Sequence, residues 1–187
     1  MSRIDQIGEV LISEEEIEKR AMELGEQITR DHEDDDVILI GILRGAVMWM
    51  TELMKHIKLD ITIDFMVCSS YGSATKTSGV VKIEKDLNSD INGKSVIIVE
   101  DIVDSGVTLT YLKKYLAGRH PKSVEVCSLL DKPCGRRTEI EPEYYGFTVD
   151  DRFIVGYGLD YDQRFRQLPY ISYLKQNDAH NRLPEEE

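Results

Sequence analysis

Apolar residues recur along the chain in two different periods. Continuous or nearly continuous apolar runs are typical of strands buried on both faces of a sheet. Such runs predict strands at residues 37–43, 60–67, 95–99, 123–130 and 153–156. Apolar residues spaced three or four positions apart predict helices instead. This spacing follows a capping box at Ser13 and Glu16 and recurs at residues 46–57 and 108–116.

Helices that alternate with strands in this way indicate an α/β fold. We expect one domain over residues 1–187, a single mostly parallel twisted sheet flanked by helices, with residues 80–85 as a short added ribbon. In such folds, ligands bind beyond the carboxyl ends of the strands. Three polar segments follow predicted strands directly and should meet at one edge of the sheet: Arg44 and Gly45, residues 100–108, and Asp131 and Lys132.

The segment at residues 97–109, IIVEDIVDSGVTL, carries two kinds of candidate chemistry. Glu100 and Asp101 are adjacent carboxylates at the end of the apolar run, and they suit Mg²⁺ or the hydroxyl groups of a ribose. The alternative is that the two acids are simply solvated at the start of a loop.

A loop of small and hydroxyl-bearing residues comes next, just before a predicted helix. Backbone N–H groups at a helix N-terminus favour an anion, Gly106 permits close approach of the backbone, and Ser105 and Thr108 add hydroxyl donors. The alternative is that Asp104 or Ser105 only caps the helix. The chain has neither G-x-x-x-x-G-K-[ST] nor G-x-G-x-x-G after a strand, so a lone phosphate on a sugar is the better interpretation.

Composition excludes several classes of partner. The 187 residues carry a formal net charge of -12, and the strongest basic stretch, residues 132–137, is too short to bind a strand of nucleic acid. The same charge disfavours anionic membranes, and no apolar stretch is long enough to span one. Three cysteines without a C-x-x-C pair, and no signal peptide, predict a cytoplasmic protein with reduced thiols. The acidic run at residues 31–36, with His32 inside it, predicts a solvated loop.

Residues 97–109 resemble the phosphoribosyl pyrophosphate signature of the type I phosphoribosyltransferases. Shorter matches make the chain similar, from about residue 7 to about residue 174, to the 6-oxopurine group of that family, the hypoxanthine-guanine phosphoribosyltransferases. The resemblance implies a type I phosphoribosyltransferase fold with a small hood that binds the base. It also implies purine salvage: hypoxanthine or guanine plus phosphoribosyl pyrophosphate gives IMP or GMP plus pyrophosphate, with Mg²⁺ as cofactor.

Two segments resemble the parts of the family that handle the pyrophosphate. Leu43, Arg44 and Gly45 resemble the pyrophosphate loop, which often contains a non-proline cis peptide, here expected between Leu43 and Arg44. Ser70 and Tyr71 resemble the start of the mobile loop that closes over the site, here expected at residues 69–79. A plain turn and a disordered loop are the respective alternatives.

Two further segments resemble those that hold the base. Lys132 corresponds to the lysine that donates to the 6-oxo group, although a lone lysine after a strand is usually solvated. Phe153 would stack on the purine and the Ile154 backbone would contact its edge, whereas Phe153 alone would be expected in the core. Asp160 would lie at the purine end and bind a second Mg²⁺, and Arg166 would contact pyrophosphate.

The resemblance assigns the remaining roles within the signature. Asp104 would be the general base at purine N7, Glu100 and Asp101 would hold the ribose hydroxyls and Mg²⁺, and residues 105–108 would bind the 5-phosphate. Ser105 stands where many relatives have threonine, and Val107 stands where polar residues are frequent, so one side-chain contact to the phosphate would be missing.

Other functions remain open at this point. The protein could prefer xanthine or another base, or it could be a nucleotide-sensing regulator on the same fold that binds RNA. A metal-dependent phosphatase with Asp101 or Asp104 as nucleophile is a third possibility. Family members are dimers or tetramers, so we expect a homodimer or homotetramer, with residues 176–187 as a frayed tail.

Overall fold

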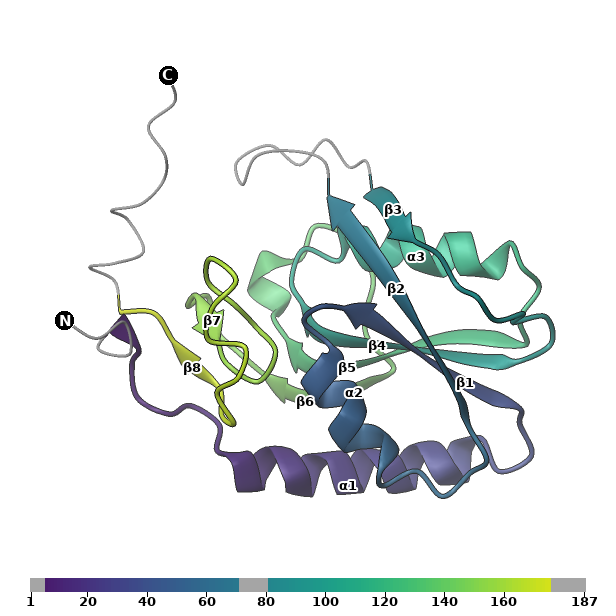
Figure 1. Ribbon diagram of the computed structural model, residues 1–187, viewed down its shortest axis with the longest axis horizontal. Helices are drawn as coiled ribbons and strands as arrows, with labels where there is room; N and C mark the ends of the chain where they lie inside the picture. Colours follow the sequence, from purple (N-terminus) through teal and green to yellow (C-terminus); the bar gives the residue numbers. More distant parts are fainter. Residues whose placement is uncertain (1–5, 71–80, 176–187) are drawn as a thin grey trace.

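The computed structural model describes residues 6–70 and 81–175 (Figure 1). The helices are α1 (Glu14–Asp31), α2 (Val47–Met54) and α3 (Val107–Ala117), and a short 3-10 turn covers Pro133–Gly135. The strands are β1 (Val37–Leu43), β2 (Thr62–Ser70), β3 (Val81–Lys85), β4 (Ser95–Val103), β5 (Ser123–Asp131), β6 (Tyr144–Thr148), β7 (Ile154–Val155) and β8 (Ser172–Tyr173). None of the helices in these ranges is long and apolar enough to cross a membrane.

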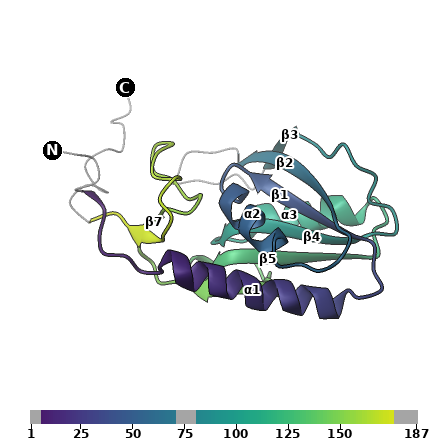
Figure 2. The same cartoon turned by 60° about the horizontal axis from the view of Figure 1, so that its bottom comes forward.

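Six strands form one sheet in the order β3-β2-β1-β4-β5-β6. Every neighbouring pair is parallel except β2 and β3. Alternate residues of β1 enter two different cores: Val37 and Leu39 pack with α1 and α2, whereas Ile38 and Ile40 pack with α3 on the other face (Figures 1 and 2). Burial on both faces explains why the strand sequence is apolar throughout. The predicted α/β class and mostly parallel sheet are confirmed.

A second, two-stranded sheet stands beside the main one (Figure 1). Its strands β7 and β8 pair antiparallel, and the N-terminal segment joins them through bridges from Ile7 to Leu174 and from Ile12 to Ile171. A separate apolar cluster that includes Val155 and Phe165 fills this region. The hood expected from the family resemblance corresponds to this small unit.

Several predicted boundaries are wrong. β4 does not stop at Val99 but continues to Val103, because β5 continues beside it and pairs Glu100 with Ser128 and Ile102 with Leu130. The helix predicted at residues 46–57 is shorter, and β2 extends to Ser70, into the segment expected to be loop. Strand β6 was not predicted, since its five residues show no clear alternation of apolar and polar positions.

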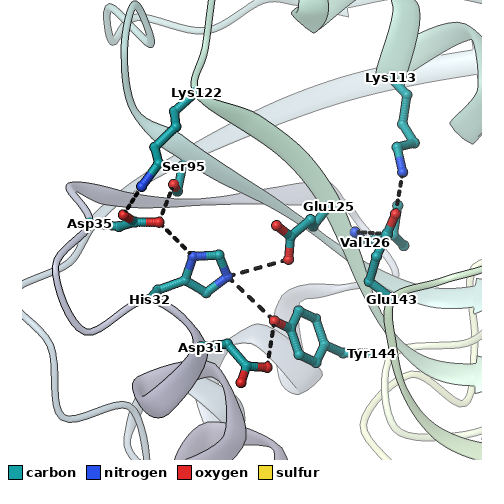
Figure 3. Close-up of polar contacts among 10 residues, drawn as sticks. All are labelled: Asp31, His32, Asp35, Ser95, Lys113, Lys122, Glu125, Val126, Glu143 and Tyr144. Atoms are coloured by element: carbon teal, nitrogen blue, oxygen red, sulfur yellow. Dashed lines mark hydrogen bonds and ion pairs between the residues drawn. The ribbon is translucent and has the colours of Figure 1, made fainter.

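The acidic run at residues 31–36 is largely exposed, as its composition predicts, but His32 and Asp35 within it are not. His32 is 5% exposed; its Nδ1 lies 3.0 Å from an oxygen of Asp35 and its Nε2 lies 3.3 Å from an oxygen of Glu125 (Figure 3). The hydroxyl of Tyr144 lies 3.4 Å from Nε2 and donates to Asp31. These contacts connect the end of α1 to β5 and β6, so His32 has a structural role at the edge of the sheet where β1, β4 and β5 begin.

Candidate active site

The three polar segments predicted to meet do meet at the carboxyl ends of β1, β4 and β5. Two adjoining cavities open there, of about 220 Å³ and about 240 Å³, and Asp101, Ile102 and Asp104 line both. The first is otherwise lined by the signature and its neighbours: Ile42, Cys68, Glu100, Val103, Ser105, Gly106, Thr108 and Leu109. The second is otherwise lined by Lys132, Arg152, Phe153, Ile154, Leu159 and Asp160. The site therefore has two compartments joined through the same acids.

The first cavity contains the start of helix α3. Gly106 occupies the N-cap position with φ +76°, a conformation that suits glycine. A Cβ atom there would lie 2.4 Å from Oγ1 of Thr138, so a side chain is also excluded by contact. The N-cap residue makes no side-chain capping bond, and the Ser105 hydroxyl accepts only a long 3.4 Å bond from the Val107 N–H. With glycine at the N-cap position, the N-terminus of α3 can receive an anion.

Glu100 and Asp101 are buried, which excludes the alternative that the two acids are simply solvated at the start of a loop. Glu100 is 9% exposed, and burial raises its pKa well above the usual value, with the charge of Asp101 adding to the effect. Burial also raises the pKa of Asp101, although the Ile102 N–H donates to its Oδ1 at 2.8 Å and partly offsets this. Within residues 6–70 and 81–175, neither carboxylate forms an ion pair with a lysine or arginine.

These carboxylates fit the Mg²⁺ that the family resemblance implies. No group of three or more histidine, cysteine, aspartate or glutamate side chains in the described residues could hold a metal on its own. Mg²⁺, however, is usually bound through one or two carboxylates, with waters and substrate phosphates completing its octahedron. Two buried carboxylates next to the loop at residues 104–107 could supply that donor set. Asp160 is separately engaged, because its Oδ1 pairs with Nη2 of Arg166 at 2.6 Å.

The expected cis peptide bond between Leu43 and Arg44 is present. Gly45 follows it and lies against Asp101, since a Cβ atom at Gly45 would be 1.7 Å from Oδ2 of Asp101. Gly158 in turn lies against Gly45, where a Cβ atom would be 2.0 Å from the carbonyl oxygen. Glycines at these positions let two loops and the central acid come into direct contact.

Lys132 reaches into the second cavity, and its side chain is 13% exposed. Its Nζ lies 3.0 Å from Oδ1 of Asp151 and 3.8 Å from Oδ2 of Asp104. Partial burial lowers the pKa of Lys132, but the bond to Asp151 and the nearby acids outweigh it, so that the pKa is raised overall. A lysine held in this way differs from the solvated lysine that is usual after a strand.

Phe153 is 49% exposed, so it is not a core residue. Its ring meets Tyr161 edge-on, with centroids 5.6 Å apart, and it lines the second cavity together with Lys132. Ile154 is buried in β7 and pairs with Tyr173. An exposed aromatic face beside a cationic donor can stack on a planar base and hydrogen-bond to it.

Five predicted residues line neither cavity: Leu43, Arg44, Gly45, Val107 and Arg166. Val107 lies in the first turn of α3 and lines neither, and Ser70 is the last residue of β2. Tyr71 and most of the predicted mobile loop lie outside the described residues, as does the predicted tail at residues 176–187.

Sequence reasoning missed three residues that hold the site together: Asp151, Gln163 and Arg136. Asp151 pairs with Lys132, and Gln163 accepts from Arg44. Arg136 donates to the carbonyl oxygens of Asp104 and Val103 and pairs with Asp131. No local sequence motif links the partners in these contacts. Only Arg136 had any signal in the sequence, because it lies in the basic stretch at residues 132–137.

Comparison with known proteins agrees with this geometry. The model of the phosphoribosyl transferase domain matches residues 10–162. The hypoxanthine-guanine phosphoribosyltransferase of Bacillus subtilis is 50% identical over 169 residues, which cover 90% of this chain and 94% of that one. The hypoxanthine phosphoribosyltransferase of Escherichia coli K12 is 50% identical over 87% of this chain and 93% of that one.

Solved structures show the same likeness. The hypoxanthine phosphoribosyltransferase of Staphylococcus aureus superposes with a TM-score of 0.92 at 42% identity, covering 96% of this chain and 97% of that one. The Trypanosoma cruzi hypoxanthine phosphoribosyl transferase, solved in a study of how its C-terminal region affects oligomeric state and activity, gives 0.88 at 33% identity, over 92% and 94%. The chain therefore belongs to the phosphoribosyltransferase family of enzymes, in its hypoxanthine-guanine group.

Proposed function

We propose that the protein transfers the phosphoribosyl group of phosphoribosyl pyrophosphate to hypoxanthine and guanine, giving IMP and GMP plus pyrophosphate in purine salvage. The observation that carries the proposal is the pair of adjoining cavities that share Asp101 and Asp104. One has the features of a sugar-phosphate site and the other those of a base site. The atoms that react, C1 of the ribose and N9 of the base, would meet where the cavities join.

The sugar phosphate is bound by the first cavity in this proposal. The N-terminus of α3 and the hydroxyls of Ser105 and Thr108 receive the 5-phosphate, while Glu100 and Asp101 hold the ribose hydroxyls. Binding energy gained at the remote phosphate then fixes the position of C1. Glu100 and Asp101 would also hold Mg²⁺, and Asp160, whose oxygens accept from Arg166 and from the Gln163 N–H in this structure, would bind a second ion. The metal would neutralise charge on the departing pyrophosphate.

The base is bound by the second cavity. Phe153 stacks on the ring, Ile154 contacts its edge and Lys132 donates to the 6-oxo group. A lysine ammonium can only donate, so it has no partner on the 6-amino group of adenine, which presents donors. This chemistry selects 6-oxopurines over adenine.

Asp104 is the proposed general base at N7 of the purine. It lines both cavities, and its carboxylate lies 3.8 Å from Nζ of Lys132, so it faces the atoms that Lys132 would bind. Removal of the N7 proton as N9 attacks C1 keeps positive charge from building on the base. A well-placed base of this kind contributes about 10²–10⁴-fold to the rate.

A parallel spectrophotometric assay tests the proposal. Phosphoribosyl pyrophosphate and Mg²⁺ are supplied with hypoxanthine, guanine, xanthine or adenine, and nucleotide formation is followed. Turnover of hypoxanthine or guanine without adenine is expected. Turnover of xanthine alone would reassign the substrate, and no turnover with any base would contradict the proposed reaction.

We also propose that the enzyme works in the cytoplasm as a homodimer or homotetramer. All three cysteines, Cys68, Cys127 and Cys134, are free thiols, which is usual in a reducing compartment. The trypanosomal relative was solved in work on its oligomeric state, which supports testing assembly here. Light scattering after size exclusion, at several protein concentrations, would distinguish a dimer, a tetramer and a monomer.

A further inference from the structure

Gln163 joins two cationic side chains at the edge of the site. Its amide oxygen accepts a hydrogen bond of 2.9 Å from Nη1 of Arg44 and another of 3.2 Å from Nη2 of Arg166. Guanidinium groups only donate, so the shared acceptor must be the amide oxygen in both cases. One neutral side chain thus holds two positive groups around a single atom.

The backbone of Gln163 is fixed by the same set of residues. Its N–H donates to Oδ2 of Asp160 at 2.8 Å, and Oδ1 of Asp160 pairs with Arg166 at 2.6 Å. Gln163 has φ +61° and the preceding Asp162 has φ +51°. This left-handed region is uncommon for residues other than glycine, and such conformations persist where surrounding contacts hold them. The loop therefore presents the Gln163 side chain in a defined direction.

The two segments that carry the arginines are also in direct backbone contact. Gly158 lies against the carbonyl of Gly45, and its own carbonyl accepts a 2.7 Å bond from Nη1 of Arg166. Contact between the segments sets their separation, but it does not orient the exposed guanidinium of Arg44. Of the two contacts that Gln163 makes to the arginines, the one to Arg44 supplies this orientation.

We propose that Gln163 is a positioning residue that presents Arg44 and Arg166 together as one anion site for the diphosphate of phosphoribosyl pyrophosphate and for the released pyrophosphate, an inference that rests on the proposed function. Two free guanidinium groups repel each other, and each long side chain loses rotamer freedom when it binds. A shared acceptor offsets the repulsion between the two guanidinium groups and restricts their rotamers before the ligand arrives. Binding is then stronger because the site is preorganised. Gln163 itself acts through the arginines and takes no part in bond cleavage.

Three variants test this role. Gln163→Ala removes the acceptor but keeps a Cβ atom, so the backbone at φ +61° is not strained further. Gln163→Glu keeps an acceptor oxygen for both arginines and serves as the rescue variant. Gln167→Ala is the matched control, because Gln167 is an exposed glutamine of the same segment, and within the described residues its side chain has no hydrogen bond to either arginine.

Two measurements are made on each variant. Calorimetric titration with inorganic pyrophosphate and Mg²⁺ reports binding without requiring turnover. Steady-state kinetics report kcat and separate KM values for phosphoribosyl pyrophosphate and hypoxanthine. We expect Gln163→Ala to weaken pyrophosphate binding, and to raise KM for phosphoribosyl pyrophosphate, by about 5–10-fold, in line with loss of bonds to charged groups. KM for hypoxanthine and the melting temperature should stay near those of Gln167→Ala, and Gln163→Glu should recover most of the loss.

Different results would reject the role of Gln163 and the proposed reaction. Wild-type protein that turns over normally, with Gln163→Ala and Gln167→Ala equal in pyrophosphate affinity, would overturn the role of Gln163 alone. Equal loss in both KM values together with a lower melting temperature would also overturn it, since the effect would be general destabilisation. Wild-type protein without turnover but with pyrophosphate binding that depends on Gln163 would keep the anion site and reject the reaction.

Discussion

The side chain of Arg136 donates a hydrogen bond of 3.0 Å from Nε to the backbone carbonyl oxygen of Asp104. Its Nη2 donates to the Val103 carbonyl at 3.3 Å and pairs with Asp131, and its Nη1 donates to the Ile140 carbonyl. A largely buried arginine thereby connects the end of β5 to the loop that carries the proposed general base.

Arg136→Ala should therefore reduce both stability and turnover. It leaves Asp131 without its cation in a mostly buried position, and breaking such a pair costs about 3 kcal/mol. Arg136→Lys should recover only part of the stability and turnover, because a single compact ammonium cannot reach the separate acceptors that the planar guanidinium contacts through three nitrogens. Chemical denaturation and kcat measure the two effects, with exposed Arg30→Ala as the control. Wild-type kcat in Arg136→Ala would contradict a role in placing Asp104.

Asp104→Asn should lower kcat by about 10²-fold or more, because the amide cannot accept the N7 proton. Binding of the ribose phosphate should be largely kept, since the shape of the side chain is unchanged. Kinetics with saturating hypoxanthine, together with titration of IMP, would show both effects. Near-normal turnover would remove Asp104 from the mechanism.

Lys132→Ala should mainly weaken binding of the purine base. The variant removes the donor to the 6-oxo group, and KM for hypoxanthine should rise by about tenfold or more, while KM for phosphoribosyl pyrophosphate changes little. Asp151→Asn is the informative comparison, because Asp151 pairs with Lys132 from the exposed side of the cavity. It should shift KM for hypoxanthine much less. Equal effects on both substrates would argue against base recognition by Lys132.

Gly135→Ala should damage catalysis more than folding. A Cβ atom at Gly135 would lie 1.7 Å from Oδ1 of Asp104, and the carboxylate, as the movable end of a side chain, would be displaced. Displacement of a reacting group by about 1 Å can reduce the rate by about 10–100-fold. Gly118→Ala is the matched control, since its φ is -64° and its nearest neighbour would be 3.4 Å away. An unchanged kcat in Gly135→Ala would show that Asp104 can adjust without loss.

Asp64 should make stability depend on pH in the acid range. Burial raises the pKa of this carboxyl, but N–H donors from Phe65, Ser89 and Asn88 outweigh it and lower the pKa from 3.8 to about 2. Because the folded-state pKa is the lower one, the stabilisation is complete above pH 4 and is lost as pH falls toward 2. The shift corresponds to roughly 2 kcal/mol.

Asp64→Asn should remove that part of the pH dependence. Denaturant unfolding at a series of pH values between 5 and 2 measures it, and exposed Asp60→Asn provides the control. The same slope in Asp64→Asn and wild type would assign the acid sensitivity to other carboxylates, among them Asp35, whose pKa is lowered by Lys122, Ser95 and His32.

Much of the fold could be predicted because its signals are local. The unbroken apolar run of β1 predicts burial on both faces, and the helical spacing after Gly106 predicts α3. Parallel topology then brings Arg44, Asp104 and Lys132 to one edge of the sheet without any knowledge of distances. The carboxyl-end rule thus brought together the three strand-end segments, whereas Phe153, Ile154 and Asp160 of the second cavity were expected only from the family resemblance.

The features of the fold and site that could not be predicted depend on contacts between residues distant in sequence. The sequence pattern places Glu100 just after the end of a strand, yet it lies inside β4 because Ser128 of β5 pairs with it. His32 resembles a surface residue, yet it is buried because Glu125 and Tyr144 surround it. Gln163 has no local pattern that points to Arg44, since their contact exists only after folding.

The pairing of Ile7 with Leu174 and of Ile12 with Ile171 has a consequence for biosynthesis. A ribosome delivers residues 97–108 well before residues 171–174, whereas the N-terminal segment must wait for its partners. The nascent polypeptide thus holds a complete sequence for the proposed phosphate loop while the small sheet beside the second cavity is still without β8. Translation supplies the two compartments in a fixed order, the proposed sugar-phosphate side early and the proposed base side last.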